Sequence, residues 1–245
     1  EASEAIFRGD PKPMATLKAD LDGWGEALES VSGLEGPAAA RRSLCRIEIQ
    51  EGLTTVMSPG ARDRAMARMV LAQVQGIDAA HPMVLWAHNG HVMHAPLRYL
   101  GAAGEREVAM GGHLREALGD RYISVGFAFG RGSFNALDRV GETWGFRTYT
   151  LGEPAAESLD AMLDGVGPGP YLLDLRRHAG ASTVNPRVTQ WLDGGHGQRW
   201  FGGYNVQLGE SQELLPTYPR QDFDVLLYLD RTTASIPMDP RLMLK

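Results

Sequence analysis

Residues 82–94 read Pro-Met-Val-Leu-Trp-Ala-His-Asn-Gly-His-Val-Met-His and combine a continuous apolar run with three histidines. Such a run is typical of a strand buried on both faces of a sheet. The Asn89-Gly90 pair favours a tight bend directly after it. Because ligands of open α/β sheets bind beyond the carboxyl ends of the strands, we expect His88 and His91 to lie at a functional site.

The rest of the chain alternates predicted helices with predicted strands. Helical spacing and helix-start signals mark residues 14–31, 38–50, 59–75, 114–118 and 154–163. Apolar runs predict further strands at residues 122–129, 147–151, 171–176 and 223–230. The alternation predicts an α/β fold, with a mostly parallel or mixed central sheet flanked by helices and an N-terminal helical segment. We expect residues 1–80 to form that helical segment and residues 81–245 to form the core, as part of one larger domain.

Two glycine-rich stretches are expected to be irregular. Residues 130–135 read Gly-Arg-Gly-Ser-Phe-Asn, which favours a plain turn at a strand end, although backbone amides there could also hold an anion. Residues 180–209 show no clear periodicity and predict long loops, which in compact domains are commonly lids or binding loops.

Composition limits the possible partners. The 245 residues carry a net charge of -6 and a pI near 5.7, which argues against nucleic acid or an anionic membrane as an electrostatically bound partner. A small-molecule substrate is expected, and a cytoplasmic location. Cys45 is the single cysteine, so it forms no internal disulfide, and we expect a buried, inert thiol. No apolar run is long enough to span a bilayer.

The three histidines have three interpretations. As metal ligands they lack any supporting cysteine or His-Glu-x-x-His pattern, so we expect neither metal nor cofactor, and a metal-dependent hydrolase is kept as an alternative. As acid/base groups, His88 and His91 suit chemistry near neutral pH. As ordinary residues, they would be a core histidine and a solvated one. His94 is expected to take no part.

A serine nucleophile is not expected, because the chain contains no Gly-x-Ser-x-Gly elbow and Ser124 falls within a predicted strand. A hydrolase built from this chain would therefore activate water directly, with a histidine or a carboxylate as the base.

Five further polar residues are candidates for substrate contact. Arg62 and Asp63 lie in the first turns of the helix predicted at 59–75, where a solvated, dipole-favoured position is the plain alternative. Asn89 lies in the predicted bend, Arg131 in the glycine-rich exit of a strand, and Asp174 at the end of the strand predicted at 171–176.

Several strings in the chain resemble motifs of the erythromycin esterase family, in the same order. They are Arg-Asp-Arg-Ala-Met-Ala at 62–67, Trp-Ala-His-Asn-Gly-His-Val at 86–92, Met-Gly-Gly-His-Leu at 110–114, Val-Gly-Phe-Ala-Phe-Gly-Arg-Gly-Ser-Phe-Asn-Ala at 125–136 and Phe-Asp-Val-Leu at 223–226. The second and fourth strings are each specific, and the likeness covers most of residues 60–235.

The resemblance implies an α/β fold with helical extensions and hydrolysis of a carboxylic ester, in known members the macrolactone of a macrolide antibiotic. A histidine is thought to activate water there without a covalent serine intermediate. Relatives of unknown substrate are often labelled succinoglycan biosynthesis proteins. On this resemblance His88 and His91 belong to the site, and Arg62 and Asp63 become pocket residues.

One part of the family pattern is missing from this chain. Family members carry, ahead of these motifs, a Gly-Glu-x-x-His-Gly string with the proposed base, and further on an assisting Glu. The chain therefore resembles the second half of such a protein. We expect either a fragment, whose partner is the missing N-terminal half, or a divergent member without the primary base. A non-catalytic small-molecule binding domain is the alternative from another class.

Overall fold

A computed structural model of the chain describes part of its residues. They are 11–33, 35–36, 38–39, 42–43, 45–47, 59–74, 82–96, 108–140, 143–176, 185–201, 206, 214–237 and 243. The chain divides into two compact units, residues 1–122 and residues 123–245. The division expected from the sequence, into residues 1–80 and residues 81–245, stays a prediction.

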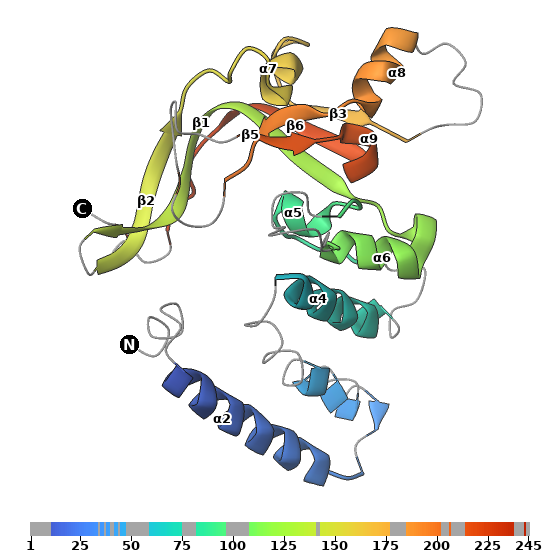
Figure 1. The fold of residues 1–245 in the computed structure, drawn as a ribbon, viewed down its shortest axis with the longest axis vertical. Coiled ribbons are helices and arrows are strands. Elements are labelled where there is room, and N and C mark those ends of the chain that lie inside the picture. Colours follow the sequence, from blue (N-terminus) through green and yellow to red (C-terminus); the bar gives the residue numbers. More distant parts are fainter. Residues whose placement is uncertain are drawn as a thin grey trace. The chain divides into compact units, whose positions relative to one another are not determined.

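The first unit is helical. Its named elements are α2 (Pro11–Ser30), α4 (Pro59–Val74), α5 (Asn89–Val92), α6 (Met110–Leu118) and the 3-10 helix η1 (Gly119–Arg121). The helices predicted near 14–31 and 59–75 are confirmed, and the described residues between 38 and 47 are helical. Helices α4 and α6 lie side by side (Figure 1). Their buried side chains include Ala65, Ala67, Met110 and Leu114.

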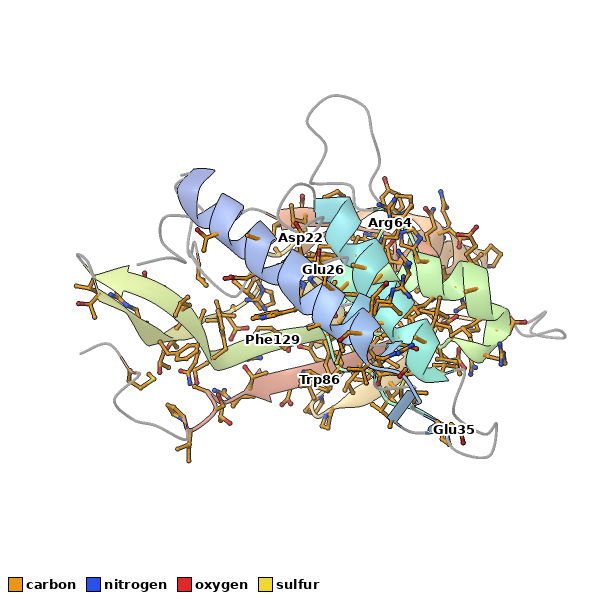
Figure 2. All side chains as sticks on the ribbon, turned by 90° about the horizontal axis from the view of Figure 1, so that it is seen from below. Asp22, Glu26, Glu35, Arg64, Trp86 and Phe129 are labelled. Atoms are coloured by element: carbon orange, nitrogen blue, oxygen red, sulfur yellow. The ribbon has the colours of Figure 1, made fainter. Side chains whose placement is uncertain are left out.

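The predicted buried strand before the histidines is wrong. Residues 82–88 belong to no strand of the described chain, and Val84 and Trp86 are 88% and 81% exposed. Trp86 is labelled in Figure 2. Burial on both faces requires neighbouring strands, and the described residues of the first unit form no strand beside this segment. The sequence pattern therefore indicates an apolar segment that this part of the chain leaves uncovered.

The second unit is built on a mixed four-stranded sheet, so the predicted α/β fold with a mixed sheet is confirmed. Its strands are β1 (Val125–Val140), β2 (Thr143–Leu151), β3 (Tyr171–Asp174) and β6 (Val225–Thr232), in the order β2-β1-β6-β3. Strands β1 and β6 are parallel, whereas the two edge strands run antiparallel to their neighbours. A separate antiparallel pair joins β4 (His196–Arg199) to β5 (Leu214–Thr217).

Helix α7 (Leu159–Asp164) packs on the sheet through contacts with β1 and β6 (Figure 1). It is shorter than the helix predicted at 154–163, because the Ser158 side chain caps it by accepting from the Ala161 amide. Helices α8 (Pro186–Asp193) and α9 (Pro219–Asp222) complete the unit. The core side chains are Leu159, Leu163, Phe223, Leu226 and Tyr228.

Two predictions of irregular structure are wrong where the residues are described. Strand β1 continues through residues 130–135, which we expected to form a turn. It passes there through Gly132, whose φ of 125° suits glycine and whose Cβ would lie 2.1 Å from the Thr232 carbonyl oxygen. Likewise α8 and β4 lie within the expected loops at 180–209, where the Asn185 side chain caps α8.

Two smaller findings concern the single cysteine and possible membrane spans. The Cys45 residue is only half-buried, rather than fully buried as expected. Among the described residues, no helix combines the length and the apolar character needed to cross a membrane.

Candidate active site

The structure brings Asp63 and His91 together. Asp63 lies on α4 with its side chain only 3% exposed, and its Oδ1 atom is 2.8 Å from Nδ1 of His91 on α5. The His91 side chain is 27% exposed, so one ring edge meets the buried carboxylate while the ring remains accessible. A carboxylate that holds one imidazole nitrogen leaves the other nitrogen available for proton transfer.

The close approach of α6 completes this pair. The backbone amide of Met110, the first residue of α6, donates to the same Asp63 oxygen at 2.9 Å. Gly111 makes the approach possible, since a Cβ there would lie 2.2 Å from the Val92 carbonyl oxygen. The Met-Gly-Gly string at 110–112 therefore lets the start of α6 approach both α5 and the Asp63 carboxylate.

His88 has a different role in the local structure. It is the N-cap of the short helix α5, and its Nδ1 accepts a hydrogen bond from the Gly90 amide at 3.1 Å. The residue is exposed. Capping fixes the ring against the helix start, so the Nε2 edge is directed away from the backbone.

The third histidine is held by a cation. Nε2 of His94 lies 2.9 Å from Nη2 of Arg115, and its ring meets the edge of the Tyr122 ring at a centroid distance of 5.8 Å. The Tyr122 hydroxyl donates to the Val92 carbonyl at 2.7 Å, which ties this cluster to α5. His94 thus supports the packing around α5.

The remaining candidates are distributed over both units. Arg62 is exposed on α4 beside Asp63, and Asn89 is half-buried at the start of α5. In the second unit, Arg131 bonds Glu153 and pairs with Asp164 at 3.1 Å. Asp174 accepts from the Arg176 guanidinium at 2.7 Å and is 40% exposed. Substrate contact by these residues stays a prediction.

Sequence reasoning missed a second buried carboxylate with a basic partner, the Asp160–Arg199 pair in the second unit. Asp160 on α7 accepts from the Arg199 amide at 2.9 Å, and both side chains are almost fully buried, at 2% and 4% exposed. Burial raises the pKa of Asp160 above the ordinary carboxyl value, opposed by its bond to the Arg199 amide and by the nearby guanidinium. No spacing in the sequence marks this pair, because its two residues are 39 positions apart and Arg199 falls in a stretch without helical or strand periodicity.

Two further features bear on the chemistry. Among the described residues, no group of three His, Cys, Asp or Glu side chains is arranged to hold a metal ion. A shallow hollow in the first unit is lined by Leu28, Glu29, Arg42 and Arg46, and its lining includes neither His88 nor His91. A hollow shared by the two histidines therefore stays a prediction.

Comparison with known proteins matches most of the chain to one family. Residues 39–232 match the model of the erythromycin esterase family. An erythromycin esterase type II from Escherichia coli is 32% identical over 111 residues, which cover 44% of this chain and 26% of that protein.

Solved structures share the fold. A Bacillus cereus protein (20% identity, TM-score 0.64) and a succinoglycan biosynthesis protein (17% identity, TM-score 0.65) each match over 95% of this chain and 53% of theirs. A mutant of the erythromycin esterase EreC in its open conformation is 19% identical with a TM-score of 0.51, over 97% of this chain and 55% of its own. The chain thus spans about half the length of these solved relatives.

Proposed function

Because the chain belongs to the erythromycin esterase family, we propose that it forms part of a hydrolase of carboxylic esters or lactones. In this proposal a histidine activates water, and no serine nucleophile takes part. The Escherichia coli relative, named as an erythromycin esterase, supports an ester or lactone as the substrate class. The single observation that carries the proposal is the Asp63–His91 pair, a buried carboxylate bonded at 2.8 Å to an accessible imidazole.

The chemistry needs a base near neutral pH and a donor for the oxyanion. An imidazole is well suited to the first task, and positioned acid/base groups typically contribute about 10²- to 10⁴-fold in rate. His88 and His91 both lie on or directly before α5, three residues apart in the sequence. Arg62 precedes Asp63 on α4 and Asn89 follows His88 at the start of α5, and both are proposed to contact the substrate.

We further propose that the partner of this chain is the polypeptide corresponding to the other half of its relatives, which would supply the primary base. Two observations support this. The match covers only 53% of the length of each of two solved relatives. The apolar side chains of Val84 and Trp86 are also exposed, shortly before His88 in the sequence. Intact-mass measurement of the native gene product tests the proposal, since a product that begins at Glu1 would contradict it.

The test of function is a hydrolysis assay with the complete gene product. Macrolide lactones and simple aryl esters are the substrates, and His88→Asn and His91→Asn are the variants. We expect hydrolysis of at least one substrate class and a loss of about 10²-fold or more in each variant. Unchanged rates in both variants would remove these histidines from the mechanism.

A parallel assay with a chelator separates the metal-dependent alternative, which requires loss of activity on metal removal. Binding of substrate without any turnover by the complete product would instead identify a non-catalytic binding domain.

A further inference from the structure

The segment that leads into His88 has the side-chain pattern of a β-strand, although it belongs to no strand of the described chain. Leu85 and Ala87 are half-buried, whereas the residues on the alternate positions are exposed. A period of two is typical of an extended backbone, because successive side chains point to opposite sides. Val84 and Trp86 therefore share one side of an extended segment, where they are 88% and 81% exposed.

The composition of this segment does not suit contact with water. Residues 83–87 read Met-Val-Leu-Trp-Ala and carry no charge. Strands with one solvated face alternate apolar with polar residues, whereas continuous apolar runs belong to strands that are covered on both faces. Native proteins commonly protect an exposed strand with charged side chains or proline, and residues 83–87 contain neither.

The backbone of the segment can accept a further strand. Within the described part of the chain, no hydrogen bond joins the backbone of Met83, Leu85 or Ala87 to another residue. In an extended segment the N–H and C=O groups of alternate residues point to the same side, so these three residues form one row of donors and acceptors. Such a row, which we call the open edge, is a template for strand pairing.

We propose that residues 83–87 are a docking strand: the polypeptide corresponding to the other half of the relatives adds a strand along the open edge and covers Val84 and Trp86. This inference rests on the partner proposed above and specifies where and how that partner binds. The occupant is chosen because the match covers 53% of the length of each of two solved relatives, so about half of each lies outside it. Main-chain hydrogen bonds would give the pairing its affinity, and the alternating side chains its specificity.

Docking at this segment would also position the candidate site. His88 directly follows Ala87 and is the N-cap of α5, where its Nδ1 atom accepts from the Gly90 amide at 3.1 Å. A strand held by a ladder of hydrogen bonds would end at this residue, so the pairing would fix the start of α5 relative to the partner. The primary base that we assign to the partner and the histidines of this chain would then be brought together by the same hydrogen bonds.

Two measurements on the complete gene product test the docking strand directly. Hydrogen–deuterium exchange at the Leu85 and Ala87 amides should be slower by about 10²-fold or more than in an unstructured peptide of the same sequence. With p-benzoylphenylalanine in place of Val84, irradiation should cross-link this position to the half of the product outside residues 1–245. Exchange at the rate of the free peptide, or cross-links only within residues 1–245, would overturn the proposal. Cross-links between two copies of the product would overturn it in favour of self-association.

Two substitutions at Val84 test whether docking is needed for hydrolysis. Val84→Arg places a charge on the side that the partner covers, and we expect kcat/KM to fall by about 10²-fold or more, the contribution of one positioned acid/base group. Val84→Ile keeps an apolar, β-branched side chain and is the matched control, with kcat/KM changed about twofold or less. Equal rates in the two variants would contradict docking at this side chain. If Val84→Arg does not fold, exchange and cross-linking decide.

These readouts separate the docking strand from the proposed hydrolysis. Slow exchange and cross-links to the other half, in a product that hydrolyses no ester, would contradict the proposed function and leave the docking strand established. Ester hydrolysis by a product whose amides exchange freely and which forms no such cross-links would contradict the docking strand alone.

Discussion

Asp63 and Asp160 are both buried carboxylates that accept a backbone amide and pair with a basic side chain, yet their partners differ. Asp160 faces Arg199, whose side chain is 4% exposed, whereas Asp63 faces His91, whose side chain is 27% exposed. The Arg199 guanidinium bonds the carbonyls of Phe129 and Gly130 within β1 and of Gly152 directly after β2, and so joins β4 to both strands. Burying both partners makes a structural pair, whereas leaving the base accessible makes one suited to proton transfer.

The largest effect is expected from breaking the structural pair. Arg199→Met leaves the Asp160 carboxylate and three carbonyl groups without their cation, and we expect a loss of about 3–5 kcal/mol in the free energy of unfolding. Denaturant unfolding at 25 °C measures it. The matched control is Arg176→Met, which removes an exposed ion pair with Asp174 and should change the free energy of unfolding far less than Arg199→Met does. Equal losses in the two variants would show that Arg199 has no special role.

A smaller loss of stability is expected in the histidine pair. Asp63→Ala leaves the Met110 amide and the His91 Nδ1–H without an acceptor, and we expect a loss of about 1–3 kcal/mol. Asp120→Ala is the control, since Asp120 is fully exposed and its loss should be near zero. A loss as large as that of Arg199→Met would indicate that Asp63 is a structural residue like Asp160.

The smallest effect concerns alkaline pH. Burial, and to a lesser extent the nearby Asp164 charge, raises the pKa of Tyr171 to about 12 from the ordinary value of 10. A raised folded-state pKa gives stability that is complete below pH 10 and is lost as pH rises through about 12.

Tyr171→Phe should therefore show a flatter decline of unfolding free energy above pH 10. At pH 7 it should lose only about 1 kcal/mol for the hydroxyl bond to the Leu163 carbonyl. An unchanged alkaline slope would show that Tyr171 does not contribute to it.

The sequence predicted those elements whose signals are local. Helix α4 begins at Pro59 and β6 covers most of the apolar run at 223–230, because start signals and apolar runs lie within the elements themselves. The strand expected at 82–87 failed, because burial depends on what covers a segment. The turn expected at 130–135 failed because β6 pairs with Arg131 and Gly132 while β2 pairs with residues 132–135.

In the candidate site, too, local signals were predictable and contacts between distant residues were not. His88 and His91 stood out by their position after an apolar run, and Asp63 by its helix start. Their bonding was not predictable, because Asp63 and His91 lie 28 residues apart, on α4 and α5, and both of these helices contact α6. Arg199 carried no local signal at all, since its contacts reach back 69 and 70 residues to β1.

The most direct test of the distinction between the two pairs measures kcat/KM and unfolding free energy together, for His91→Asn in the complete gene product. We predict that ester hydrolysis falls by about 10²- to 10⁴-fold while the free energy of unfolding changes by about 1 kcal/mol or less. Wild-type kcat/KM in this variant, or a loss of activity that only follows a loss of folded protein, would contradict the account.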